Sequence, residues 1–202
     1  MTYVSLGASC SIAYNLKKFD LRNEAYPFDW TRTLNLNNIC KAIDNEFKDF
    51  LNLNKFELKK LDESFFIEGN KCSYIYKNDY CSFYHDFYDE ITKIDVNTFK
   101  QKYKRRIVRF LELLKSDKEI IFIREQIGKL NVNKINNLIK SLNNYNKNMN
   151  YKIIIITNDI NYKNININKI YFYFSDVKVL DWKRCELNWE KLFFIFTTNP
   201  YV

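Results

Sequence analysis

Strand-like and helix-like segments alternate in the second half of the chain, and this alternation constrains the fold more than any other feature. Residues 119–124, 152–157 and 170–174 are continuous apolar runs rich in Ile and aromatic residues, which is typical of strands covered on both faces. Between the first two runs, residues 132–142 carry apolar side chains at helical spacing. Parallel strands need crossover connections of this kind. The pattern predicts an α/β fold with a mostly parallel sheet flanked by helices in three layers.

The first half of the chain adds elements that fit this scheme. A short β-rich run over residues 3–6 leads through Gly7 into a segment with helical spacing. Apolar stripes predict two further helices, over residues 37–50 and 98–114. The chain therefore opens with a strand, a tight loop and a helix.

An aromatic, β-prone insertion is expected around residues 65–87, with Gly69-Asn70 as the turn between its strands. The closing segment, which contains Trp182 and Trp189, is expected to pack a last helix or strand onto the sheet. The chain has 202 residues, 47% of them hydrophobic, which is enough for one sizeable core. Because no repeat or linker interrupts it, we expect a single α/β domain over residues 1–202.

Basic residues outnumber acidic residues by 32 to 24, which gives a formal net charge of +8. A clustered basic face can bind nucleic acid by releasing phosphate counterions. Here the lysines are scattered among Asp and Glu, and the one dense group, at 102–109, is expected to be the solvated face of a helix. The charge pattern therefore argues against a nucleic acid partner. Neither a signal-peptide pattern nor a membrane-length apolar run is present, so we expect no membrane association.

Five cysteines lie at irregular spacing, at positions 10, 40, 72, 81 and 185. An odd number without regular spacing does not suggest a disulfide framework and fits a reducing compartment, so we expect a soluble cytoplasmic protein. Cys40, Cys72 and Cys81 fall in apolar or aromatic sequence, which favours core packing. Cys72, Cys81 and His85 lack a fourth ligand at a recognised spacing, so we expect neither a metal site nor a cofactor.

Cys10 lies at the junction between the first strand and the helix that follows, in the stretch Ser-Leu-Gly-Ala-Ser-Cys over residues 5–10. Backbone N–H groups at a helix start lack intrahelical partners, and the helix dipole favours negative charge there, so a thiol at this point is biased towards the thiolate. Sites in sheets of this type form at the carboxyl ends of strands. The loop before Cys10 is expected at such an end, together with residues 124–126 and 157–159.

The chain contains one histidine, His85, and a thiol nucleophile needs an imidazole to accept its proton. If Cys10 is a nucleophile, His85 is its only imidazole partner. The carboxylate that orients the ring could be Asp29 or Asp86, and Asp86 is disfavoured because adjacent residues in a strand point to opposite faces. Backbone N–H groups of residues 8–11 would bind the oxyanion.

Two other interpretations stay open for the same residues. A cysteine at such a junction can simply fill space in the core, and a histidine between aromatic residues can be a half-buried structural side chain, which would leave an idle interaction protein. Alternatively, the helix start could bind an anionic ligand such as a nucleotide or sugar phosphate. Arg105, Arg106 or Arg124 would then supply the counter-charge.

The ordered set of motifs resembles the family catalogued under the description "putative papain-like cysteine peptidase". The matching pieces, which cover residues 3 to about 125, are Val4-Ser5-Leu6-Gly7-Ala8-Ser9-Cys10, Pro27-Phe28-Asp29-Trp30, His85-Asp86-Phe87, Tyr103-Lys104-Arg105-Arg106 and Ile121-Phe122-Ile123-Arg124. The resemblance implies a cysteine nucleophile at Cys10 and a histidine base at His85. The chain departs from papain-like enzymes where a glutamine would precede the cysteine, since Val4 stands there, and no aromatic residue follows Cys10.

These lines of reasoning predict a cysteine-dependent hydrolase or acyl transferase that acts on a peptide or a small acyl compound. The expected catalytic residues are Cys10, His85 and Asp29. The expected substrate-binding residues are Ser5, Gly7, Ser9, Trp30 and Arg124.

Overall fold

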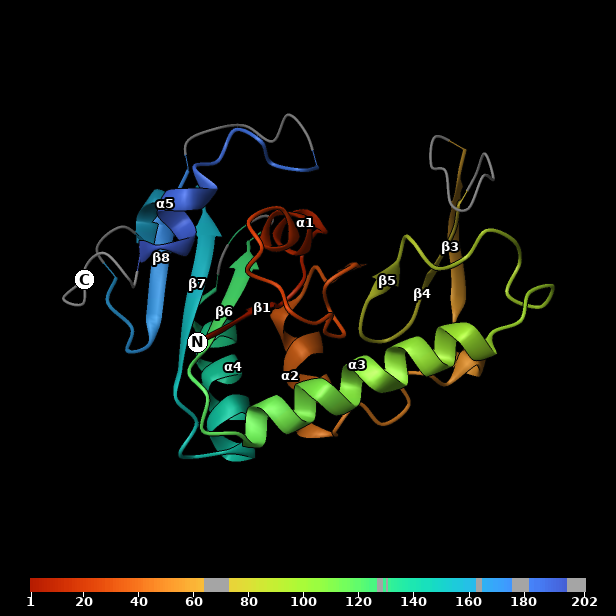
Figure 1. Ribbon diagram of the computed structural model, residues 1–202, viewed down its shortest axis with the longest axis horizontal. Helices are drawn as coiled ribbons and strands as arrows, with labels where there is room; N and C mark the ends of the chain where they lie inside the picture. Colours follow the sequence, from red (N-terminus) through yellow and green to blue (C-terminus); the bar gives the residue numbers. More distant parts are fainter. Residues whose placement is uncertain (64–72, 127–128, 130, 163–164, 176–181, 196–202) are drawn as a thin grey trace.

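The computed structural model describes residues 1–63, 73–126, 129, 131–162, 165–175 and 182–195. A parallel sheet with strand order β1-β6-β7-β8 occupies one half of the molecule, on the left in Figure 1. Its strands are β1 (Thr2–Ser5), β6 (Ile120–Glu125), β7 (Tyr151–Thr157) and β8 (Ile170–Phe174). All four lie where the sequence predicts strands, and the mostly parallel sheet is confirmed.

Helices cover both faces of this sheet, because successive strand residues point to opposite sides. In β6, Phe122 belongs to a large core that also contains side chains from α2 (Leu36–Asp44), α3 (Asn97–Lys115) and α4 (Val132–Tyr145). Its neighbours Ile121 and Ile123 face a second core, which α1 (Ser11–Lys18) and α5 (Trp189–Phe193) cover. The three-layer arrangement of helices around a sheet is therefore confirmed.

A separate antiparallel sheet has the strand order β2-β5-β4-β3. Its strands are β2 (Thr31–Arg32), β3 (Glu57–Asp62), β4 (Ser73–Lys77) and β5 (Ser82–Phe83). The predicted insertion supplies β4 and β5, whereas β2 and β3 come from segments for which no strand was predicted. The expected turn at Gly69-Asn70 and the expected core residue Cys72 lie outside the described residues.

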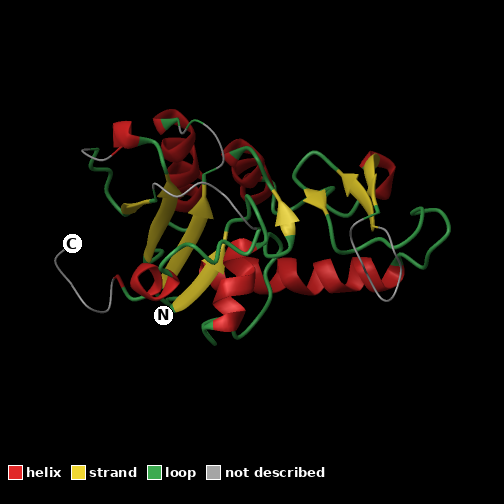
Figure 2. Cartoon of the chain, turned by 90° about the horizontal axis from the view of Figure 1, so that it is seen from above, coloured by secondary structure: helices red, strands yellow, loops and turns green. Residues whose placement is uncertain are grey.

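Helix α3 runs alongside both sheets and joins them (Figures 1 and 2). Near its start, Phe99 packs against Phe83 of the antiparallel sheet, with 5.3 Å between the ring centroids. Near its end, Phe110 packs 6.4 Å from Phe122 in the parallel sheet. One helix therefore fixes the position of the antiparallel sheet relative to the parallel one.

The second helix is shorter than the sequence predicts. It ends at Asp44 instead of continuing to residue 50, because Glu46, Phe47 and Asp49 adopt positive φ angles. Phe47 and Phe50 are nevertheless buried. The apolar stripe therefore predicts the core residues correctly, but it does not predict where the helix ends. Among the helices in the described ranges, none is both long enough and apolar enough to cross a membrane.

Candidate active site

The loop between β1 and α1 is held in a strained, tightly packed conformation. Gly7 and Ala8 have φ angles of 74° and 77°, a region that L side chains rarely adopt. The Gly7 N–H donates to Ser5 Oγ at 3.1 Å, and the Ala8 N–H donates to Thr33 Oγ1 at 3.0 Å. A Cβ atom at Gly7 would lie 2.4 Å from Thr33 Oγ1, so this position requires glycine. The loop thereby places Cys10 at the N-cap of α1.

Cys10 and His85 lie in contact, with 3.3 Å between Sγ and Nε2. Cys10 comes from the carboxyl end of the parallel sheet, whereas His85 lies two residues after β5 of the antiparallel sheet. The Trp30 ring packs edge-on against the imidazole, with 5.6 Å between centroids. The structure thus brings together two residues that are 75 positions apart in the sequence.

Burial raises the pKa of the Cys10 thiol to about 12; the negative charges of Asp86 and Asp29 add to this rise, and Arg32 opposes it. Burial also lowers the pKa of His85 below its ordinary value, against the opposing effect of Asp86. Both pKa shifts favour the neutral forms, a thiol at Cys10 and an uncharged imidazole at His85. The direction of the Cys10 shift is opposite to the bias towards the thiolate expected from the helix start, because loss of hydration disfavours the charged form of the thiol.

The two aspartates near the pair are held in different ways. Asp29 is 1% exposed and accepts from the Tyr26 N–H at 3.0 Å and from Arg22 at 3.3 Å. Its burial raises its pKa to about 6 in spite of these two partners. Asp86 accepts from the Tyr103 hydroxyl at 3.0 Å and lies 2.5 Å from Lys102 Nζ. Because Asp86 influences the pKa of both Cys10 and His85, it is a stronger electrostatic neighbour of the pair than its sequence position indicates.

The predicted substrate-binding residues divide into two groups. Ser9 and Trp30 are half-buried and lie next to Cys10 and His85. Ser5, Gly7 and Arg124 are buried beneath the loop and bond to the chain itself. A role in substrate binding stays a prediction for all five.

Arg124 stabilises the loop from below. It is 1% exposed, and its guanidinium donates to Leu6 O at 2.9 Å, Thr33 Oγ1 at 2.6 Å and Thr33 O at 2.6 Å. Burial lowers its pKa to about 9. The side chain therefore joins β6 to the Cys10 loop and to the residue after β2.

Replacing Arg124 with methionine is expected to destabilise the fold, because each buried carbonyl left without a donor costs about 1–3 kcal/mol. Urea unfolding followed by circular dichroism would measure the loss. The matched control is Arg105→Met, since Arg105 is exposed on α3. Equal stability of the two variants would contradict the role assigned to Arg124.

The first turn of α1 supplies the expected oxyanion donors, with one exception. The Ala8 N–H is already bound to Thr33, as described above. Within the described contacts, the N–H groups of Ser9, Cys10 and Ser11 have no acceptor, and the Cys10 side chain does not cap the helix. These three groups point to the helix start as the place where a developing negative charge could be stabilised.

Among the residues that the structure describes, the other cysteines and the potential metal ligands form no second centre. Cys40 and Cys81 are buried and Cys185 is exposed. Across the described ranges, no group of three His, Cys, Asp or Glu side chains is arranged to hold a metal ion.

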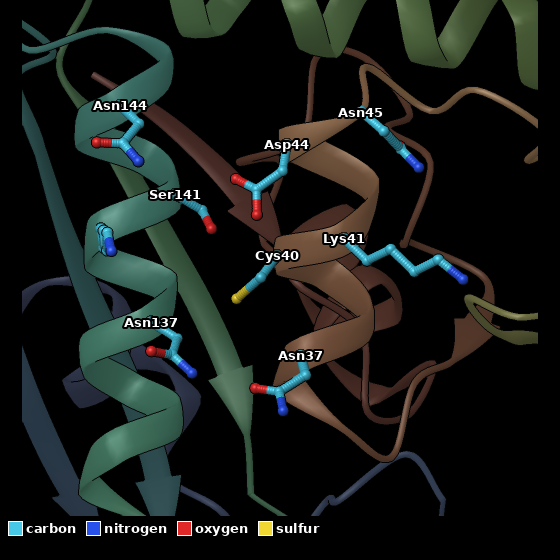
Figure 3. A pocket seen from close by; sticks show the side chains of 9 residues that line it. Asn37, Cys40, Lys41, Asp44, Asn45, Asn137, Ser141 and Asn144 are labelled. Carbon is cyan, nitrogen blue, oxygen red and sulfur yellow. The ribbon is translucent and has the colours of Figure 1, made fainter.

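A groove of about 610 Å³ lies between α2 and α4 (Figure 3). Asn37 and Cys40 line it from α2, and Asn137 and Ser141 line it from α4, with Cys40 Sγ directed towards Ser141. The groove contains neither Cys10 nor His85, so it is separate from the candidate active site.

Comparisons with known proteins agree with the motifs in the N-terminal part of the chain. A family model described as "Putative papain-like cysteine peptidase" matches residues 1–161. The chain is also 31% identical over 215 aligned residues to "Uncharacterized protein R408" of Acanthamoeba polyphaga mimivirus; the alignment covers 94% of this chain and 96% of that protein. No solved structure matches the chain.

Proposed function

This chain belongs to the family described as "Putative papain-like cysteine peptidase", and we propose that it is a cysteine-dependent hydrolase or acyl transferase. The observation that carries the proposal is the 3.3 Å contact between Cys10 Sγ and His85 Nε2. A thiol and an imidazole at hydrogen-bond distance are the minimum machinery of nucleophilic acyl transfer.

Since both pKa shifts favour the neutral forms, proton transfer accompanies the attack. The Cys10 proton passes to His85 Nε2 as Sγ forms a bond to the substrate carbonyl carbon, and the carbonyl oxygen becomes an oxyanion. The N–H groups at the start of α1 stabilise that charge. The imidazolium then returns its proton to the leaving group, and a thioester remains on Cys10. Water, or another acceptor in a transferase, then attacks the thioester while His85 accepts its proton; the bond to Cys10 Sγ breaks, and the released sulfur takes that proton back from His85.

Two neighbours support His85 in this scheme. Trp30 limits rotation of the imidazole by edge-on packing. Asp86, held by Tyr103 and Lys102, stabilises the imidazolium that forms during the attack, because its charge raises the pKa of His85. Asp29, predicted to orient the ring, bonds to the turn around Tyr26 and to Arg22, and its catalytic role stays a prediction.

The pH dependence of Cys10 alkylation by iodoacetamide tests the proposal. If His85 accepts the thiol proton, the rate is level at neutral pH and falls in acid as His85 becomes protonated, at a pH below the ordinary histidine pKa. In His85→Ala, only the rare thiolate reacts, so the rate is lower at neutral pH and climbs about tenfold per pH unit towards the raised thiol pKa. Identical profiles for the two chains would refute the dyad. Peptide mapping by mass spectrometry separates Cys10 from the other cysteines.

A second candidate function rests on the unbonded N–H groups at the start of α1. These groups, with Arg32 close enough to lower the pKa of Cys10, would also suit an anionic ligand. Thermal stabilisation by a sugar phosphate or nucleotide that survives Cys10→Ser would favour this binding function over catalysis.

A further inference from the structure

We propose that Glu125 and Arg184 act as a positioning pair that holds the residues on both sides of Cys10 and so aligns the thiol with His85. The proposal rests on the proposed function, because it assigns these residues to the control of the same thiol. Neither residue touches Cys10 in the described contacts, so each would act through its neighbours.

One carboxylate oxygen binds both residues that flank Cys10. The Ser9 hydroxyl donates to Glu125 Oε2 at 2.8 Å, and the Ser11 hydroxyl donates to the same oxygen at 3.0 Å. The two hydroxyls also lie 2.6 Å apart. Glu125 is the last residue of β6 and is 4% exposed, so this anchor belongs to the parallel sheet and is shielded from water. The loop is therefore fixed on both sides of the nucleophile at one point.

Arg184 holds the other oxygen of the same carboxylate. It forms an ion pair with Glu125 Oε1 and a second one with Glu186, and it is 5% exposed. With both oxygens engaged, the Glu125 carboxylate cannot turn away from Ser9 and Ser11. A buried carboxylate without a cation would destabilise the fold, so the function of Arg184 in the pair is to neutralise the charge of Glu125.

The segment that carries Arg184 is itself fastened to the candidate active site. Asn15, on the inner face of α1, donates to Lys183 O at 2.7 Å, and Trp189 Nε1 donates to Arg184 O at 2.7 Å. The Trp182 ring packs edge-on against Tyr14 of the same helix, with 5.4 Å between centroids. The C-terminal segment thus holds α1 at two places and Glu125 at a third.

A positioning role and simple stabilisation of the fold predict different rates of Cys10 alkylation. Unfolding or general loosening would expose Cys10 and raise its alkylation rate whether or not His85 is present. Misalignment of a folded loop would instead leave the rate in the His85→Ala chain unchanged and reduce only the acceleration that His85 provides. The informative quantities are therefore the Cys10 alkylation rate in the His85→Ala chain, which should stay unchanged, and the ratio of the rates in chains with His85 and with His85→Ala.

The experiment measures both quantities with iodoacetamide at neutral pH, with Cys10 followed by peptide mapping, for Glu125→Gln, for the double variant Ser9→Ala/Ser11→Ala, and for Glu24→Gln. Glu24 is the matched control, because it pairs with Arg109 at the surface at 3.2 Å. We expect the ratio to fall about tenfold to hundredfold in the first two folded variants and to stay unchanged in the control. An unchanged ratio in both folded test variants would overturn the positioning role.

Amide hydrogen exchange of residues 9–12 gives a readout that does not depend on catalysis. Faster exchange in Glu125→Gln than in Glu24→Gln supports the positioning pair, and equal exchange overturns it. If the parent chain has a ratio of one, the proposed hydrolase function fails, while the exchange comparison still decides whether Glu125 positions the loop. The two failures are therefore distinguishable.

Discussion

A Cys10→Ser chain is expected to form no covalent acetyl adduct with p-nitrophenyl acetate and to lose roughly 10³-fold or more of its hydrolysis rate. Serine keeps the shape of the side chain, but its hydroxyl is a far weaker acid than a thiol, and a neutral imidazole of lowered pKa cannot remove its proton efficiently. Intact-protein mass spectrometry detects the adduct, and nitrophenolate absorbance gives the rate.

Cys40→Ser is the control for this prediction, because Cys40 lines the groove between α2 and α4, which contains neither Cys10 nor His85. It should keep both the adduct and the rate. Turnover that persists in Cys10→Ser and disappears in Cys40→Ser would show that Cys10 is not the nucleophile.

A His85→Gln chain is expected to retain its fold and to hydrolyse the same ester about 10²–10⁴-fold more slowly, the usual contribution of a general base. Glutamine can accept a hydrogen bond from Cys10 but cannot take up its proton. Tyr84→Phe is a suitable control, since it removes a hydroxyl one residue away that contacts Lys59 at 3.5 Å. A further test is added imidazole, which should restore part of the rate in His85→Gly, where the missing ring leaves room.

A folded His85→Gln chain with the rate of the parent would exclude the dyad. The result would then favour a ligand-binding role for the helix start, because that role requires no proton acceptor. The same outcome together with stabilisation by a phosphate-containing ligand would identify the anion-binding function.

The parallel sheet and the pairing of Cys10 with His85 could be predicted because each rests on a strong restriction. Buried parallel strands leave continuous apolar runs, as at β6 and β7, and a chain with one histidine has one possible imidazole base. The position of Cys10 between a strand and a helix follows from local periodicity alone.

The antiparallel sheet was harder to predict because its strands carry weak signals. Strand β3 is mostly exposed, and its sequence Glu-Leu-Lys-Lys-Leu-Asp has neither a clear alternation nor a run of β-branched residues. Strand β2 is two residues long. Both are strands because of their partners β4 and β5, and such long-range pairing is not encoded in local sequence.

The electrostatic environment of Cys10 could not be predicted from the sequence either. The bias towards a thiolate follows from the helix start, but the opposing effect of burial depends on how completely the folded chain covers Cys10. Glu125 was marked only by its place at the carboxyl end of a strand. Its ion pair with Arg184 joins residues 59 positions apart, and no sequence motif predicts this pairing.

The course of α3 limits how this site could be moved or redesigned. Phe110 of this helix packs on the sheet that carries the Cys10 loop, and Tyr103 bonds to Asp86 next to His85. Because an α-helix rotates by about 100° per residue, inserting one residue between these two contacts would turn one of them away from its partner. Grafting the short Cys10 loop onto another protein would leave the base behind, so the smallest transferable unit comprises both sheets and the helix that spans them.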